Sequence, residues 1–348
     1  MGKVCTFRKG YGISKENLSS DGTPCILYGE LYTTYKTAIA KRIKSKTSLD
    51  PTTLFHSKKN DVIIPCSGET AEDIATSVCI PYDDILLGGD LTVIRSDLDG
   101  AFLSNQINSV RKYDIARIAQ GKSIVHLQAD ELKKIFIAYP TIEEQQKISG
   151  FIDKIDERIE VQNKIISKYE TLIKGIRHRI FSSICGERQF SLGSFLEEYS
   201  EKNVANNLQS VAVGKYGIRK REEIYSKELS ADYSKNKVIR KDTLIIGMGS
   251  TQIDIGILTT DDYYCVSPAY TTYRIKGINS FYLQEYLIEL NPLLSVRYMI
   301  TSARQGKAVN KEDLMKHLMT IHSENEQKEI CQCFENLYSR LQTEKEML

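Results

Sequence analysis

Apolar residues recur at alternating intervals of four and three positions along two segments of the chain, which is the seam pattern of a coiled coil. In the first segment the apolar positions are Ile148, Ile152, Ile155, Ile159, Ile166, Tyr169, Ile173, Ile176 and Ile180. In the second they are Ile330, Phe334, Leu337, Leu341 and Leu348. No proline interrupts residues 141–186, and acidic residues near its start suit a helix N-terminus. We therefore predict long helices over residues 142–186 and 323–348.

The first predicted helix is roughly 60 Å long at about 1.5 Å per residue, more than one compact domain can cover. We therefore expect the two helices to pack together in antiparallel orientation. Each seam has one polar position, and the two patterns coincide when Gln162 is aligned with Glu344. These polar residues either fix the register at a cost in stability or mark where the seam turns to solvent. The alternative is two ordinary amphipathic helices, each buried on its own domain.

Short β-type runs bounded by turn residues precede each predicted helix. They cover residues 62–64 and 91–94 in the first region, and residues 243–246 and 270–273 in the second, where a helical stretch follows near 281–287. The pattern predicts an α+β protein. Its expected organisation is a domain over residues 1–141, a central helix over 142–186, a second domain over 187–322 and a C-terminal helix over 323–348.

The two regions are related by a long internal repeat. Asp61 returns as Asp242, Phe102-Leu103 as Tyr282-Leu283, Gln120-Gly121-Lys122 as Gln305-Gly306-Lys307, and Glu144-Gln145 as Glu326-Gln327. Four matches in the same order, at nearly one separation, indicate a duplicated unit of domain size. An antiparallel helix pair would relate two such units by a pseudo-twofold axis.

Composition limits the kind of partner that the protein can have. Its 47 Lys and Arg residues balance 45 Asp and Glu residues, which excludes a polycationic DNA-coating protein and a strongly acidic mimic. The eight cysteines form no CxxC pair and are expected to be reduced thiols. The sequence has no apolar signal core and no run of about 20 apolar residues. We expect a cytoplasmic protein without a membrane partner.

Motifs for catalysis are missing from the sequence. It has no GxxxxGK[ST] phosphate loop, no Gly-x-Ser-x-Gly elbow and no His-Glu-x-x-His helix. No Cys or His set has metal-ligand spacing. We therefore expect no catalytic residue, metal or cofactor on this chain. A self-sufficient nuclease or methyltransferase with an unfamiliar site is one alternative, and a coiled-coil adaptor for proteins, without sequence-specific DNA binding, is another.

Local groups of cations, tyrosines and small polar residues in both regions favour DNA binding. Arg and Lys can read guanine, Gln and Asn adenine, and Glu can accept from cytosine. The candidate DNA-binding residues are Lys15, Tyr32, Thr33, Lys36, Ser67, Glu69 and Thr70 in the first region, and Lys215, Tyr216, Arg219, Lys220, Ser250, Thr251 and Gln252 in the second. The alternatives are a solvated charged surface and, for the tyrosines, ordinary core packing.

Several motifs resemble the specificity subunits of type I restriction–modification systems. They are Tyr28-Gly29-Glu30-Leu31-Tyr32, Gly121-Lys122-Ser123-Ile124-Val125-His126-Leu127, and a Pro-x-x-x-Glu-Gln-x-x-Ile pattern that begins at Pro140. The second copy of the last pattern keeps Glu326-Gln327 and Ile330 but lacks the proline. The resemblance covers nearly the whole chain.

The resemblance implies two α/β target recognition domains separated by two long antiparallel helices, with each domain reading half of a split DNA site. Such proteins are non-catalytic. Their partners are double-stranded DNA, two methyltransferase (modification) subunits that carry S-adenosylmethionine, and restriction (motor-nuclease) subunits. In the family the helical regions are the principal platform for the methyltransferases. We expect the two half-sites to lie about one helical turn apart on one face of B-DNA.

One part of the seam has no counterpart in the second copy. Alignment of the two seams places the equivalents of Ile173, Ile176 and Ile180 beyond Leu348. We therefore predict that the stripe formed by Tyr169, Ile173, Ile176 and Ile180 is left for a partner subunit or for terminal docking.

Overall fold

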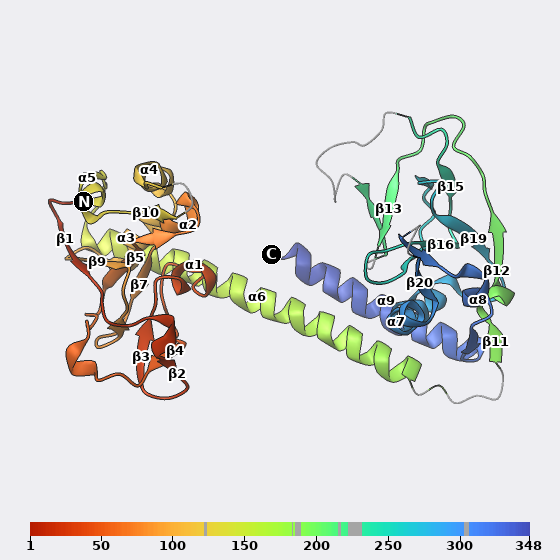
Figure 1. Ribbon diagram of the computed structural model, residues 1–348, viewed down its shortest axis with the longest axis horizontal. Coiled ribbons are helices and arrows are strands. Elements are labelled where there is room, and N and C mark those ends of the chain that lie inside the picture. The colour runs from red at the N-terminus through yellow and green to blue at the C-terminus, as the bar shows by residue number, and fades with distance from the viewer. Residues whose placement is uncertain (122–123, 183, 185–188, 215–216, 222–231, 303–305) are drawn as a thin grey trace. The chain divides into compact units, whose positions relative to one another are not determined.

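The computed structural model describes residues 1–121, 124–182, 184, 189–214, 217–221, 232–302 and 306–348 (Figure 1). Lys122 and Ser123 of the sequence motif, and the candidate residues Lys215 and Tyr216, lie outside these residues. The chain divides into two compact units, Met1–Val161 and Gln162–Leu348. None of the helices in the described part of the chain has the length and apolar character needed to cross a bilayer.

The first unit is built on an antiparallel sheet with strand order β1-β9-β5-β7. These strands are β1 (Cys5–Lys9), β5 (Asp61–Pro65), β7 (Val78–Ile80) and β9 (Leu91–Ser96). A second sheet and a small ribbon contain β2 (Leu18–Ser19), β3 (Thr23–Ile26), β4 (Ser45–Thr47), β8 (Leu86–Leu87), β6 (Ser67–Gly68) and β10 (Val125–His126). The helices are η1 (Lys15–Asn17), α1 (Glu30–Thr33), η2 (Pro51–Thr53), α2 (Ala71–Ile74), α3 (Gly100–Asn108), α4 (Lys112–Ile118), α5 (Ala129–Lys134) and the start of α6 (Ile142–Ser182).

The second unit has an antiparallel sheet with strand order β12-β19-β16-β17. These strands are β12 (Leu196–Tyr199), β16 (Thr243–Gly247), β17 (Asp254–Leu258) and β19 (Thr271–Ile275). Two-stranded ribbons pair β11 (Gln189–Ser191) with β22 (Leu318–Thr320), β13 (Val211–Gly214) with β14 (Gly217–Lys220), β15 (Lys237–Ile239) with β18 (Tyr264–Val266), and β20 (Met299–Ser302) with β21 (Gly306–Val309). The helices are η3 (Leu192–Phe195), α7 (Ser280–Tyr298), α8 (Lys311–Met315), α9 (Glu324–Glu346) and the remainder of α6.

The strand runs predicted from sequence are the centres of the two sheets. Residues 61–65 are buried at every position, and so are residues 243–247. Both faces of these strands are covered, so they read as continuous apolar runs and not as alternating ones. The α+β prediction is confirmed.

The internal repeat is visible in the strand pairing of the two units. Val62 pairs with Ile94 in the first sheet, and Thr243 pairs with Arg274 in the second. The repeat that aligns Asp61 with Asp242 also aligns Val62 with Thr243, and the match of Phe102 with Tyr282 aligns Ile94 with Arg274. The two pairs therefore occupy equivalent places. The two sheets therefore have the same strand order and the same register.

The helices repeat in the same order as the strands. Helix α3 follows the sheet in the first unit as α7 does in the second. Helices α6 and α9 begin at equivalent positions, just before the repeated Glu-Gln pair. The duplication therefore includes both the sheet and the helix that comes after it.

The Glu of each repeated Glu-Gln pair caps a long helix. The backbone N–H of Thr141 donates to Glu144 Oε2 at 3.1 Å, and the N–H of Glu144 donates to Thr141 Oγ1 at 3.4 Å. Ser323 and Glu326 form the same reciprocal pair at the start of α9. Such a capping box satisfies two N–H groups that have no partner within the helix.

The Gln of each pair braces the helix start against the chain before it. Gln145 Nε2 donates to the carbonyl of Pro140, and Gln327 Nε2 donates to the carbonyl of His322, each at 2.8 Å. Gln145 Oε1 also accepts from the N–H of Asp99, the residue that caps α3. Both glutamines are buried. The Glu-Gln signature therefore has a structural role in this chain.

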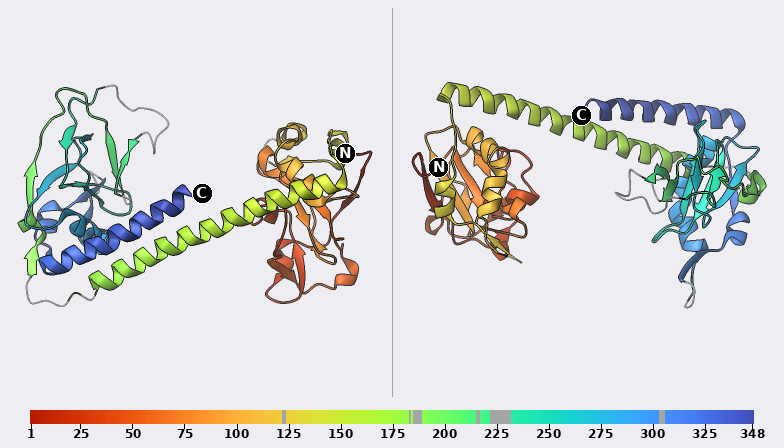
Figure 2. Two further views of the ribbon diagram at one scale, coloured as in Figure 1. Left: turned by 180° about the vertical axis from the view of Figure 1, so that it is seen from behind. Right: turned by 90° about the horizontal axis from the view of Figure 1, so that it is seen from above.

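In the second unit, α9 packs antiparallel against the C-terminal half of α6 (Figures 1 and 2). Glu170 of α6 pairs with Lys345 near the end of α9, whereas Arg177, later in α6, bonds Tyr338, which lies earlier in α9. The predicted antiparallel packing is confirmed for this half of α6.

The polar position of the seam lies inside the helix pair. Gln162 is 3% exposed, and its Nε2 donates to the backbone carbonyl of Glu344 at 2.7 Å and to its carboxylate at 2.6 Å. The seam therefore does not turn to solvent at Gln162. A buried amide that is bonded across the pair favours one register, because any other register would leave it without a partner.

Candidate nucleic-acid interface

In the first unit, α1 and the loop before α2 bring three candidate residues together. Burial raises the pKa of the Tyr32 hydroxyl, and the nearby acidic groups of Tyr28, Glu69 and Asp73 raise it further. Thr70 caps α2: its Oγ1 accepts from the N–H of Asp73 at 3.1 Å. Glu69 is exposed, so its carboxylate oxygens can accept hydrogen bonds from a base edge.

Ser67 lies directly before this loop, in the ribbon β6–β10. It is 9% exposed and pairs with His126. Ser67 lines a hollow of about 430 Å³ together with Arg8, Lys9 and His126. Asp90 also lines this hollow, which was not predicted because its residues come from four segments far apart in the sequence.

The other candidate residues of the first unit are spread over its surface. Lys15 lies in η1, Thr33 ends α1, and Lys36 follows it; all three are exposed. Lys36 begins a basic run that also holds Lys41, Arg42, Lys44 and Lys46, and part of this run is used within the unit. Lys41 pairs with Asp153 and Glu157 of α6 at 2.6 and 2.7 Å. The run therefore also has a structural role.

In the second unit, the candidate residues lie on a hairpin and on a loop. Arg219 and Lys220 belong to strand β14, and residues 250–252 lie between β16 and β17. Gly249 opens this loop, and a side chain there would collide with the carbonyl of Gln252, only 2.1 Å from the Cβ position. Glycine is thus required for the tight bend that presents Ser250 and Thr251, both exposed, and Gln252, which is half-buried.

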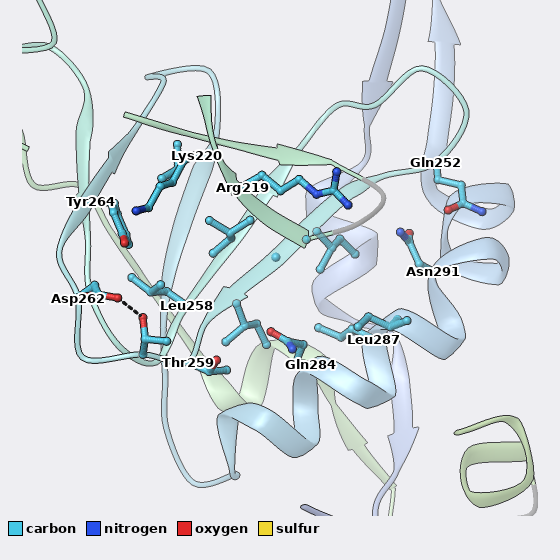
Figure 3. Close-up of a pocket in the computed structure, with 18 of the residues that line it drawn as sticks. Arg219, Lys220, Gln252, Leu258, Thr259, Asp262, Tyr264, Gln284, Leu287 and Asn291 are labelled. Carbon is cyan, nitrogen blue, oxygen red and sulfur yellow. Dashed lines mark hydrogen bonds between the residues drawn. The ribbon is translucent and has the colours of Figure 1, made fainter. Parts of the chain in front are cut away.

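Three of these candidate residues meet around one pocket (Figure 3). Arg219, Lys220 and Gln252 line a cavity of about 440 Å³ between the β13–β14 hairpin, strand β17 and helix α7. Sequence reasoning did not find the remaining lining residues, because they come from segments whose proximity depends on the fold. The pocket lies wholly within the second unit.

The predicted subunit interface on α6 is wrong. Ile173 is 4% exposed in the core of the second unit, and Tyr169, Ile176 and Ile180 pack against that core. Both α7 and α9 cover this stripe. Arg177 Nε donates to the buried Glu285 of α7 at 2.8 Å, and the ring of Phe181 contacts α7. The stripe therefore does not need a longer α9 or a partner to cover it.

An apolar stripe is exposed elsewhere, on the N-terminal half of α6. Ile148, Phe151, Ile155 and Ile159 are 43%, 67%, 43% and 42% exposed, and their spacing places them on one face of the helix. Gln145 and Ser149 are buried on the adjoining face, toward the first unit, and the half-buried Ile152 lies at the border between the two faces. We call these four exposed residues the α6 stripe.

The fold defines a class: a protein of two repeated α+β units, each followed by a long helix. Residues 1–171 match the family model described as the type I restriction modification DNA specificity domain.

Solved structures of type I systems share the fold of the whole chain. A type I restriction–modification S subunit from M. genitalium is 15% identical with a TM-score of 0.63, and the match covers 99% of this chain and 90% of that one. A structure described in terms of complex assembly and conformational transition of the type I R-M system is 16% identical with a TM-score of 0.55, covering 99% of this chain and 92% of that one. At these identities the likeness concerns the fold.

Proposed function

We infer that the chain is the DNA-recognition specificity subunit of a type I restriction–modification system. The observation that carries this inference is the match of residues 1–171 to the DNA specificity domain family. The same sheet and register are repeated in the second unit, which supports the same role for that half. A coiled-coil adaptor would not need two sequence-reading domains.

The two units should read different DNA sequences, because their candidate surfaces are unlike. The first presents an exposed carboxylate, Glu69, beside the half-buried Tyr32. The second presents Arg219, Lys220 and Gln252 around a pocket. An acceptor suits cytosine, whereas an arginine or a glutamine suits guanine or adenine. The expected target is therefore bipartite and asymmetric.

The chemistry belongs to partner subunits in this proposal. Two methyltransferase subunits would supply S-adenosylmethionine and the methylating site, and restriction subunits would supply the motor and nuclease. The α6 stripe is the surface that we assign to a methyltransferase subunit, because the helical regions are the methyltransferase platform in the family and this stripe is apolar and exposed. We also propose that the protein is located in the cytoplasm, where it has access to the chromosome.

Selection from a pool of randomised duplexes tests the function. The chain, purified with its methyltransferase partner, is expected to enrich one split motif at physiological salt. Glu69→Ala should relax one base position of that motif by about 1–3 kcal/mol, because a base-reading group is lost. The control Lys36→Ala should weaken all sequences about equally and lower the salt dependence. Enrichment of no motif would favour the adaptor.

A further inference from the structure

The pocket of the second unit has the composition of a ligand site. Its floor is apolar and includes Ile218 of the hairpin, Ile257 of β17 and Leu287 of α7. Its volume of about 440 Å³ lies in the range of small-molecule sites. Polar side chains line the cavity around this floor (Figure 3).

Several of these polar groups have unused hydrogen-bonding capacity. Among the residues that the structure describes, the amides of Gln252 and Gln284, the hydroxyl of Tyr264 and the ammonium of Lys220 make no hydrogen bond or ion pair within the chain. Amide groups can donate and accept at once. They can therefore pair with the mixed donor and acceptor edge of a nucleobase.

The charges of the pocket are divided between its two ends. Arg219 and Gln252 lie at one end, while Lys220, Tyr264 and Asp262 lie at the other (Figure 3). Asp262 is the single carboxylate among the described lining residues, and it accepts a hydrogen bond from Thr260 at 2.8 Å. The Arg219 end therefore presents a guanidinium and an amide to the cavity, and a guanidinium suits a phosphate.

In the first unit, buried side chains fill the position that is equivalent to the pocket. Val78 pairs with Ile63 as Ile257 pairs with Leu244, so Ser77 corresponds to Gly256 of the second unit.

The helix that lies against this strand differs in the same way. Counting from the residues that cap α3 and α7, Ser104 corresponds to Gln284. The hydroxyls of Ser77 and Ser104 are buried and lie 3.1 Å apart. The pocket is thus particular to the second unit and is not a consequence of the shared sheet.

We propose that this pocket binds one nucleotide, with the base against the apolar floor and the phosphate at the Arg219 end. The proposal rests on the proposed function, because the DNA target would supply that nucleotide in an unstacked conformation. Enzymes that flip bases read them in this manner, through hydrogen bonds to the base edge and apolar contacts to its faces. A free nucleotide would make the same contacts.

Two variants of α7 provide a matched test. Ile288 lines the pocket and is 41% exposed, so Ile288→Trp fills the cavity from its rim without disturbing the core. Val296 lies on the same helix, is 84% exposed and is not in the lining, so Val296→Trp is the control.

The first measurement places 2-aminopurine in turn at each position of the mapped DNA site, in complex with the chain and its methyltransferase partner. We expect a several-fold rise in fluorescence at one position that Ile288→Trp abolishes and Val296→Trp retains. The second measurement titrates each of the four deoxynucleoside monophosphates into the full chain by calorimetry. Ile288→Trp should weaken binding of at least one of them tenfold or more, and Val296→Trp should not.

The outcomes separate the two sources of the nucleotide. A response in DNA supports an unstacked base, and a response to free nucleotide alone supports the same pocket chemistry with a free ligand. The proposal is overturned if Ile288→Trp changes neither measurement, and the proposed function survives that result if the complex still selects one DNA motif. If the complex selects no motif, the proposed function fails, while the calorimetric arm still tests the pocket.

Discussion

Replacing residues 1–141 by the equivalent unit of a known type I specificity subunit is expected to change one half of the recognised DNA motif completely and to leave the other half unaltered. Each unit has its own hydrophobic cores, and its candidate DNA-binding residues lie within that unit. The exchange therefore transfers one reading surface whole. Sequencing of methylated adenines in cells that coexpress the methyltransferase measures both halves at once.

The junction of this chimera needs attention to two contacts at the start of α6. Thr141 caps the helix with Glu144, and Gln145 accepts from the backbone of Asp99 in the exchanged unit. The incoming unit should keep a Ser or Thr at position 141, because loss of an N-cap costs about 1 kcal/mol. The reciprocal exchange of residues 187–322 serves as the control and should alter the other half. A change in both halves after a single exchange would show that the units do not read independently.

Converting the α6 stripe to a charged surface is expected to abolish association with the methyltransferase subunit. Phe151 is 67% exposed in the isolated chain, so Phe151→Asp should leave the fold intact while placing a charge in an apolar contact. Truncation of an aromatic anchor at the centre of an interface costs about 2 kcal/mol or more, which is roughly thirtyfold in affinity. The double variant Phe151→Asp with Ile155→Asp should show no binding in a pull-down or by calorimetry.

Leu172→Asp provides the control for this prediction. Leu172 is another exposed apolar residue of α6, 49% exposed, outside the α6 stripe. The Leu172→Asp variant should bind the methyltransferase as tightly as the unmodified chain does. If the double variant binds the methyltransferase as tightly as the unmodified chain does, the α6 stripe is not part of the surface that contacts it. Circular dichroism of both variants separates a lost contact from a lost fold.

The sequence predicted those parts of the fold whose pattern is local. The central strands of both sheets are buried on both faces and therefore read as short apolar runs. The helices α6 and α9 are marked by their seam and by the repeated Glu-Gln pair. The structure adds that this pair caps and braces the helices.

What the sequence did not determine is which element covers each apolar face. Periodicity marks Ile173 as buried, but it cannot tell whether α9, a partner or α7 lies over it. Gly256 and Gln284 join one pocket only because α7 packs on β17, so spacing gave no signal for it. Lys41, which follows the candidate residue Lys36 by five positions, is paired with carboxylates from α6, which comes much later in the chain.

The most direct measurement of the central claim is a genome-wide map of methylated adenines in cells that express the unmodified chain with its methyltransferase partner. The account predicts methylation confined to one asymmetric motif with two specified parts and an unspecified gap between them. Cells that lack the chain should show none of it. Methylation at a single uninterrupted motif, or a pattern that does not change when the chain is removed, would contradict the account.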